Sequence, residues 1–173
     1  KEIIKKNIIQ GATSNPAIFE SSITSSVAYK QQLDMLQANN AKTIYEELAL
    51  TDIKRAAALL TDLHKKDADD GFISIEVDPL LCDDAAGTIE EGVRLYSSIN
   101  VDNVMIKIPA TEAGYIAMRE LTSKGINVNA TLIFSPEQAI KCTQALDEGI
   151  RDSNKDIKAV VSVFVSRFDR LAD

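Results

Sequence analysis

The stretch VMIKIPATEAGYIAMRELTSKGINVNATLI, residues 104–133, holds two short apolar segments separated by an amphipathic one. Residues 104–108 and 127–133 are rich in Val and Ile, as parallel strands covered on both faces are. Residues 112–124 repeat apolar side chains with the long period of a helix, and Gly125 suits the end of that helix. The stretch therefore predicts a strand, a helix and a second strand parallel to the first.

The same alternation runs through the rest of the chain. Further strands are expected at residues 8–13, 72–77 and 159–165. Further helices are expected at residues 29–39, 41–66, 84–99 and 136–153, the second with a break near Thr51-Asp52. Ser135-Pro136-Glu137-Gln138 predicts a helix start, because Ser caps, Pro suits the first helical position and Gln138 completes a capping box. Five βα units fit either an open doubly wound sheet or an arc of a (β/α)8 barrel.

The composition and the absence of certain motifs disfavour several classes of function. The 173 residues carry 19 basic and 26 acidic side chains, a net charge of −7, which disfavours binding to nucleic acid or to anionic membranes. No apolar run approaches the roughly 20 residues of a membrane span, and residues 1–6 (KEIIKK) lack the apolar stretch and small-residue cleavage site of a secretory signal. Cys82 and Cys142 lack metal-site spacing and fit a reducing compartment, so a cytoplasmic protein is expected. The length of 173 residues predicts one domain. No turn carries a GxGxxG or P-loop motif.

One charged residue stands out, because Lys107 lies inside an apolar strand segment. Burying an ammonium costs several kcal/mol unless it is paired or deprotonated. One interpretation is an ion pair buried at the end of the strand. The other is an amine whose pKa is lowered by its surroundings, so that it can attack a carbonyl and form a Schiff base.

Other predicted strands also place polar side chains near their C-terminal ends. Ser74 and Glu76 share one face of their strand by alternation, and so do Asn129 and Thr131 in another. In a (β/α)8 barrel this is the rim at which active sites are assembled from several strands. The repetition favours a functional site that includes Lys107.

The first and last predicted strands add residues to the same rim. Thr13 and Asn15 follow the first strand in a Thr-Ser-Asn-Pro turn, for which a turn without a ligand is the alternative. Ser162 and Arg167 lie at the end of the last. An arginine at a βα junction suits a phosphate, and the alternatives are a surface ion pair to Asp169 or a role at the start of a helix. A small phosphorylated carbonyl compound is therefore the expected substrate.

The segments ATSNPAIF, ISIEVDP, VMIKIPAT, GINVNATLIFS and SVFVSRFD resemble the strand-end motifs of the transaldolase family, in the same order and at similar spacing. The resemblance implies a (β/α)8 barrel that transfers a dihydroxyacetone unit from sedoheptulose 7-phosphate to glyceraldehyde 3-phosphate. This reaction belongs to the non-oxidative pentose phosphate pathway. Neither a metal nor an organic cofactor is implied.

The family pattern also implies catalytic roles. Lys107 resembles the lysine that forms the Schiff base. Glu76 resembles the carboxylate that relays protons through a water molecule, and Thr131 resembles the residue that also holds this water.

Further positions match the family's substrate site. Thr13 resembles a packing or hydrogen-bonding neighbour, and Asn15 a group that binds substrate hydroxyls. Ser74, Asn129 and Ser162 resemble residues that line the sugar pocket, and Arg167 resembles a phosphate-binding arginine.

The chain is shorter than the family pattern. A (β/α)8 barrel typically needs about 250 residues, and this sequence resembles strands two to six, without the first strand and its acid/base aspartate or the last two strands. We therefore expect an incomplete barrel of about five βα units forming a single domain over residues 1–173, a piece of a longer protein that is inactive alone. Its two open sheet edges would be filled by the missing segments or by a second copy in a homo-oligomer. The alternatives are a related lysine aldolase, of the fructose 6-phosphate or deoxyribose-phosphate type, and a noncatalytic module.

Overall fold

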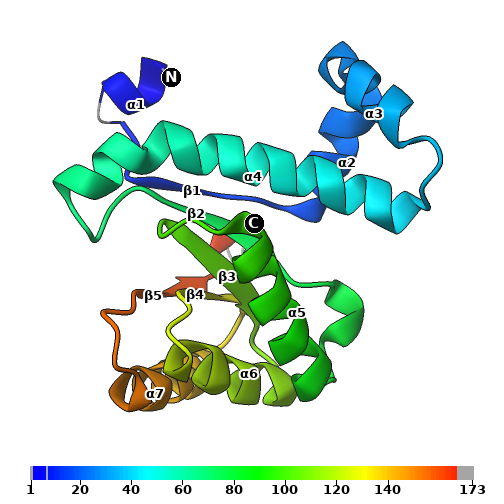
Figure 1. Cartoon of the computed structure of the whole chain (residues 1–173). Coiled ribbons are helices and arrows are strands. Elements are labelled where there is room, and N and C mark those ends of the chain that lie inside the picture. The colour runs from blue at the N-terminus through cyan, green and yellow to red at the C-terminus, as the bar shows by residue number, and fades with distance from the viewer. Residues whose placement is uncertain (1, 7, 167–173) are drawn as a thin grey trace. The chain divides into compact units, whose positions relative to one another are not determined.

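The computed structural model describes residues 2–6 and 8–166, in which strands and helices alternate as the sequence predicts (Figure 1). The strands are β1 (Gly11–Thr13), β2 (Phe72–Glu76), β3 (Val104–Pro109), β4 (Val128–Ile133) and β5 (Ala159–Val163). The α-helices are α1 (Glu2–Lys5), α2 (Pro16–Ser25), α3 (Lys30–Leu36), α4 (Ala41–Lys66), α5 (Ala85–Ile99), α6 (Glu112–Ser123) and α7 (Pro136–Asp152), and the short 3-10 helices are η1 (Val27–Tyr29) and η2 (Pro79–Leu81).

Strand order decides between the two arrangements that the sequence leaves open. The order in the sheet is β1-β2-β3-β4-β5, and β1 pairs with β2, β3 with β4 and β4 with β5 in parallel. A doubly wound sheet reverses its strand order at a switch point, whereas a barrel adds each strand beside the previous one. The fold is therefore an incomplete (β/α) barrel.

Contacts between Cα atoms divide the chain into two compact units. The first comprises Lys1–Ile75 and Ser98–Val104, and the second comprises Glu76–Ser97 and Met105–Asp173. The division between the units falls within β2, after Ile75, and within β3, after Val104.

In the first unit, the long helix α4 buries one face, formed by Leu48, Ala49, Leu50, Ile53, Ala57 and Leu60. The buried Asn103 side chain donates hydrogen bonds to the carbonyl oxygens of Ala57, at 3.0 Å, and Gly71, at 2.8 Å. Gly71 has a φ of +77°, which glycine adopts without strain. Asn103 thus joins α4 to the turn that begins β2.

The predicted break in α4 near Thr51-Asp52 is wrong, because the helix is continuous over its 26 residues. The Thr51 hydroxyl donates to the Glu47 carbonyl oxygen of the preceding turn, at 2.8 Å, so it is satisfied within the helix. Asp52 accepts a short hydrogen bond from the Tyr29 hydroxyl. This bond is the largest cause that raises the pKa of Tyr29 to about 12.

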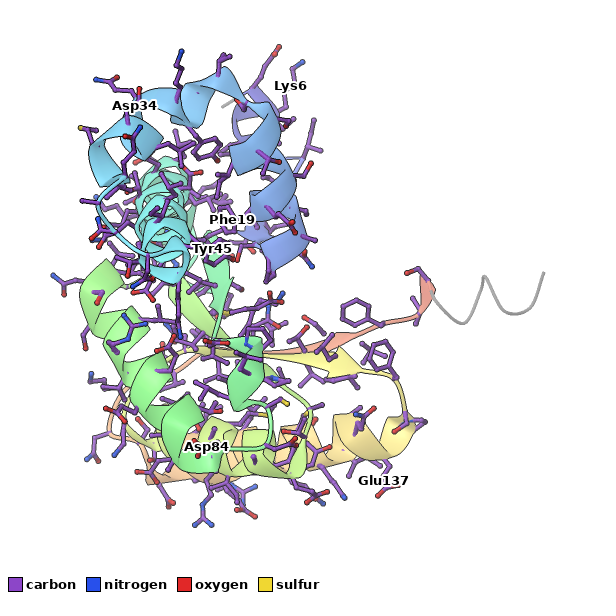
Figure 2. The ribbon with its side chains drawn as sticks, turned by 90° about the vertical axis from the view of Figure 1, so that its right-hand side faces the viewer. Lys6, Phe19, Asp34, Tyr45, Asp84 and Glu137 are labelled. Carbon is purple, nitrogen blue, oxygen red and sulfur yellow. The ribbon has the colours of Figure 1, made fainter. Side chains whose placement is uncertain are left out.

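Helix α2 was not predicted, although the sequence carried a signal for it. Asn15 is its N-cap, with Oδ1 accepting from the Ala17 N–H at 2.8 Å, and Pro16 occupies the first helical position. Figure 2 labels Phe19 and Tyr45, whose rings meet edge to face at 6.2 Å between α2 and α4. The helix buries no residue, which is why its apolar spacing gave no clear periodicity.

In the second unit, β3 and β4 are almost entirely buried, and α6 and α7 lie side by side along the sheet (Figure 1). A Cβ on Gly114 would lie 1.9 Å from the Pro109 carbonyl oxygen, so only glycine allows α6 to start this close to the end of β3. The Thr111 hydroxyl accepts from the Gly114 N–H at 2.9 Å and donates to the Cys82 carbonyl oxygen at 2.6 Å. Gly125, at φ +82°, follows α6 as predicted.

The outer strands are shorter than predicted. β1 begins at Gly11, not residue 8, and Ile8 is 61% exposed. Only the three residues of β1 pair with β2, and all three are exposed. β5 ends at Val163 rather than residue 165. A strand with one neighbour has fewer backbone partners along its length, so its ends leave the ladder sooner than apolar spacing suggests.

Candidate active site

The predicted lysine lies where an ammonium needs a partner. β3 is apolar on both sides of Lys107, and the Lys107 side chain is only 7% exposed. Its Nζ donates to Glu76 Oε1 at 2.5 Å, and the Glu76 side chain is 21% exposed. The Val77 N–H donates to the Lys107 carbonyl oxygen at 3.3 Å, which sets the end of β2 beside Lys107. Two predicted site residues thus form an ion pair within the second unit.

The contact between Lys107 and Glu76 is the ion pair that one interpretation predicts. It also places a proton acceptor beside the amine, as Schiff-base chemistry requires. A buried ion pair recovers its desolvation cost only with close geometry. A carboxylate at hydrogen-bond distance from an ammonium is also a group that can receive its proton and return it. Both interpretations of Lys107 are compatible with this geometry.

Asn129 and Ser162 are also brought together. Asn129 on β4 is the register partner of Lys107 on β3 and of Val160 on β5. The Ser162 hydroxyl donates to Asn129 Oδ1 at 2.8 Å. Asn129 is buried, so the hydrogen bond fixes an amide in the row that contains Lys107.

Thr131 is placed by the same strand. It is the register partner of Pro109, two positions beyond the Lys107–Asn129 pair, and it is buried. By alternation its side chain shares a face with that of Asn129. Immediately after it the register with β5 shifts, and Leu132 adopts a φ of +56°.

The other predicted residues of β1 and β2 belong to the first unit. Thr13 and Ser74 are register partners, and the Ser14 N–H donates to the Ser74 carbonyl oxygen at 3.0 Å. Ser74 is buried, whereas Thr13 and Asn15 are exposed. Asn15 Oδ1 caps α2, so this side chain already has a structural role at the strand end.

Arg167 lies outside the described residues, and the phosphate contact assigned to it stays a prediction. Within the described part of the chain, no three His, Cys, Asp or Glu side chains gather in a way that could hold a metal ion. None of the described helices combines the length and apolar character needed to cross a bilayer.

Two groups on α7 have shifted pKa values. Burial raises the pKa of the Cys142 thiol to about 11. Hydrogen bonds to Glu112 and then Glu137 raise the pKa of Lys141, whose side chain is 40% exposed and 2.9 Å from Glu112 Oε1. Unlike Lys107, Lys141 lies on the outer surface of a helix.

Sequence reasoning missed one residue beside this site. The sequence pattern predicts only a capping box for Gln138, and the Ser135 hydroxyl does accept from the Gln138 N–H at 3.1 Å. The Gln138 side chain, however, bonds to Phe134 and Ala110, in the loops after β4 and β3. The capping-box pattern located the residue, but pairing between distant loops leaves no local sequence signal.

Fold and site together define the class of protein: an incomplete (β/α) barrel in which a buried strand lysine pairs with a part-buried glutamate at the end of another strand. The sequence model of the Transaldolase/Fructose-6-phosphate aldolase family matches residues 1–173. The chain belongs to this family.

Relatives agree with this assignment. The chain is 52% identical over 174 residues to a transaldolase of Campylobacter jejuni subsp. jejuni serotype O:23/36, with 94% of this chain covered. It is 48% identical over 172 residues to a transaldolase of Helicobacter pylori strain Shi470, with 99% of this chain covered. In both cases the match covers 53% of the relative, so the chain spans about half the length of these proteins.

Proposed function

We propose that the protein from which this sequence comes is a transaldolase that works through a Schiff base on Lys107. The donor would be sedoheptulose 7-phosphate and the acceptor glyceraldehyde 3-phosphate, in the non-oxidative pentose phosphate pathway. The observation that supports this most is the 2.5 Å contact between Lys107 Nζ and Glu76 Oε1 inside an apolar sheet. Family membership and the transaldolase relatives support the same reaction class.

The first half of the reaction needs a proton acceptor beside the amine. Glu76 takes a proton from the Lys107 ammonium, and the neutral amine adds to the donor ketone to give a carbinolamine. Glu76 then returns the proton to the carbinolamine hydroxyl, which leaves as water. The product is an iminium ion with Glu76 again a carboxylate, so charge is conserved over the two steps. In the family pattern, a water molecule held by Thr131 assists this relay.

The iminium ion provides the electron sink for carbon–carbon cleavage. A base removes the proton from the hydroxyl on the carbon that will become the aldehyde. The carbon–carbon bond then breaks, and its electron pair moves into the iminium to form a three-carbon enamine while the aldehyde leaves. In the family pattern this base is an aspartate on a strand before those present here. The enamine carbon then attacks the acceptor aldehyde, and hydrolysis of the new iminium frees Lys107.

The remaining predicted residues would hold the sugar. Asn129, fixed by Ser162, and Asn15 would bind enamine hydroxyls and delay release of the unit to water. Ser74 and Thr13 would line the pocket, and Arg167 would bind the phosphate. We expect the reaction to need no cofactor, and we expect the 173-residue chain alone to be inactive, in keeping with its span of about half the relatives' length.

Borohydride trapping tests the proposal. The complete protein is reduced in the presence of fructose 6-phosphate, and the modified lysine is located by peptide mass spectrometry. We expect one adduct, on Lys107, that disappears in Lys107→Met. Lys141→Met is the matched control, because Lys141 also pairs with a glutamate but is exposed. An adduct that persists in Lys107→Met would refute the mechanism.

The family description also names fructose-6-phosphate aldolase, which makes an aldolase the second candidate. An aldolase would release free dihydroxyacetone from fructose 6-phosphate without an acceptor. A transaldolase would turn over only when an acceptor aldehyde is added. Measuring dihydroxyacetone with and without glyceraldehyde 3-phosphate separates the two.

A further inference from the structure

β4 contains an extra residue directly after Thr131. Ala130 pairs with Val161 and Ile133 pairs with Val163, so three steps along β4 match two along β5. Leu132, at φ +56°, lies within this bulge. A bulge takes backbone groups out of the ladder and re-aims neighbouring side chains. On its β5 side the ladder is therefore interrupted at Thr131, which still pairs with Pro109 of β3.

Gln138, in the first turn of α7, supports the end of β4 from outside the ladder. Its Oε1 accepts from the Phe134 N–H at 2.9 Å, just past the bulge. Its Nε2 donates to the Ala110 carbonyl oxygen at 3.0 Å, just past the end of β3. Glu137, labelled in Figure 2, marks this end of α7. One half-buried amide thus joins the loops that follow two neighbouring strands.

Helix capping does not explain the hydrogen bond from Gln138 to the Ala110 carbonyl oxygen. In a capping box the Gln side chain accepts from the N–H of the capping residue, here Ser135. Gln138 reaches instead to Phe134 and, with its other end, to Ala110 in a loop 28 positions earlier. The buried Ala110 also donates its N–H to the Thr131 carbonyl oxygen at 2.9 Å. Ala110 is therefore held by both Gln138 and Thr131.

We propose that Gln138 is a positioning residue that holds the ends of β3 and β4 together, so that Lys107 and Thr131 face one substrate carbonyl. This inference rests on the proposed function. Gln138 binds backbone atoms of Ala110 and Phe134, which lie three residues after Lys107 and Thr131. The Gln138 side chain therefore acts through the backbone and does not touch the substrate. Displacements of about 1 Å at reacting groups can cost roughly 100-fold in rate.

Two substitutions of Gln138 test its two side-chain hydrogen bonds separately. Gln138→Glu keeps an acceptor for the Phe134 N–H but has no Nε2–H to donate to Ala110, whereas Gln138→Met removes both bonds. Gln144→Glu, on an exposed position of the same helix, adds the same charge and is the matched control. Each variant of the complete protein is mixed with fructose 6-phosphate and reduced with borohydride, and the rate of adduct formation on Lys107 is measured against donor concentration.

We expect the maximal rate in Gln138→Glu and Gln138→Met to fall at least tenfold, with the half-saturating donor concentration unchanged within about twofold. Gln144→Glu should match the wild type. Amide hydrogen exchange provides a measurement that needs no activity. The Phe134 N–H loses its acceptor only in Gln138→Met, so protection at Phe134 should fall in that variant and persist in Gln138→Glu. The Ala110 N–H donates to Thr131, and its protection should fall in both variants because the Ala110 carbonyl is no longer held in place by Gln138. A merely stabilising residue would change the melting temperature without this split.

The outcomes are distinct. A wild-type adduct on Lys107 together with an unaffected rate in Gln138→Glu overturns this inference and leaves the proposed function standing. Unchanged Ala110 protection in both variants also overturns it. A wild-type protein that forms no adduct overturns the proposed function itself, and the positioning role falls with it.

Discussion

Two lysine–glutamate pairs in the second unit use the same atoms in different surroundings. Lys107 and Glu76 meet at 2.5 Å with side chains 7% and 21% exposed, and Lys141 and Glu112 meet at 2.9 Å with side chains 40% and 84% exposed. The first pair joins neighbouring strands, and the second bridges α7 and α6 on the surface. Distance is nearly the same, so burial is what separates a candidate catalytic amine from an ordinary surface contact.

The largest effect is expected from breaking the buried pair. Glu76→Gln leaves the Lys107 ammonium without its carboxylate, and removing one partner of a buried pair costs about 3 kcal/mol. A double-mutant cycle with Lys107→Met should give a coupling of about 2 kcal/mol in urea unfolding of the complete protein. The same cycle with Glu112→Gln and Lys141→Met should stay below about 0.5 kcal/mol. Equal couplings in the two cycles would contradict the comparison.

A second consequence of burial concerns the cysteines. The pKa of buried Cys142 is raised to about 11 from 9.0, so the unfolded chain loses this proton at lower pH than the folded protein. The stabilisation is fully present below pH 9 and is lost as the pH rises to about 11. We expect the melting temperature to fall across this window, and to fall less in Cys142→Ala, as measured by circular dichroism at pH 8, 9, 10 and 11. Parallel slopes for the two proteins would exclude this thiol as a cause.

Cys82, which is half-buried, gives a direct comparison with Cys142. Only the thiolate reacts with iodoacetamide, and access is also required. At pH 8 we expect Cys82 to be alkylated at least tenfold faster than Cys142 in the folded protein, and the two rates to converge in denaturant. Peptide mass spectrometry over time measures both rates in one sample. Faster reaction at Cys142 would show that α7 opens readily.

The smallest effect is expected at the surface pair. Lys141→Met should change the free energy of unfolding by less than about 0.5 kcal/mol. This difference should vanish in 1 M NaCl, where the Debye length is about 3 Å. The contribution of Lys107–Glu76 should persist under the same conditions, because salt screens buried charges much less. A salt-sensitive buried pair would mean that solvent reaches Lys107.

Much of the fold was predictable from local pattern. β3, β4 and α6 were correct to within one residue, because buried parallel strands and an amphipathic helix each leave a distinct periodicity. The break in α4 was predicted wrongly because Thr51 and Asp52 are weak helix formers, yet both side chains find partners in the folded protein. β1 was predicted too long because apolar residues at its start are exposed.

The candidate site was predictable in its residues more than in its contacts. A lysine in an apolar strand and a glutamate in another identified Lys107 and Glu76, but only the register shows that they touch. The bulge at Leu132 could not be predicted, because leucine is not a residue that favours a positive φ. The bonds of Gln138 depend on two loops that are distant in sequence.

The hydroxyl of Thr111 has one hydrogen to donate, to Cys82, and accepts another from Gly114. Alanine has neither capacity, an ionised aspartate cannot donate, and asparagine places its donor and acceptor on separate atoms of a longer side chain, whereas serine has both in one hydroxyl. Across related proteins, evolutionary variation at this position should therefore be restricted to threonine and serine, although the residue touches no substrate.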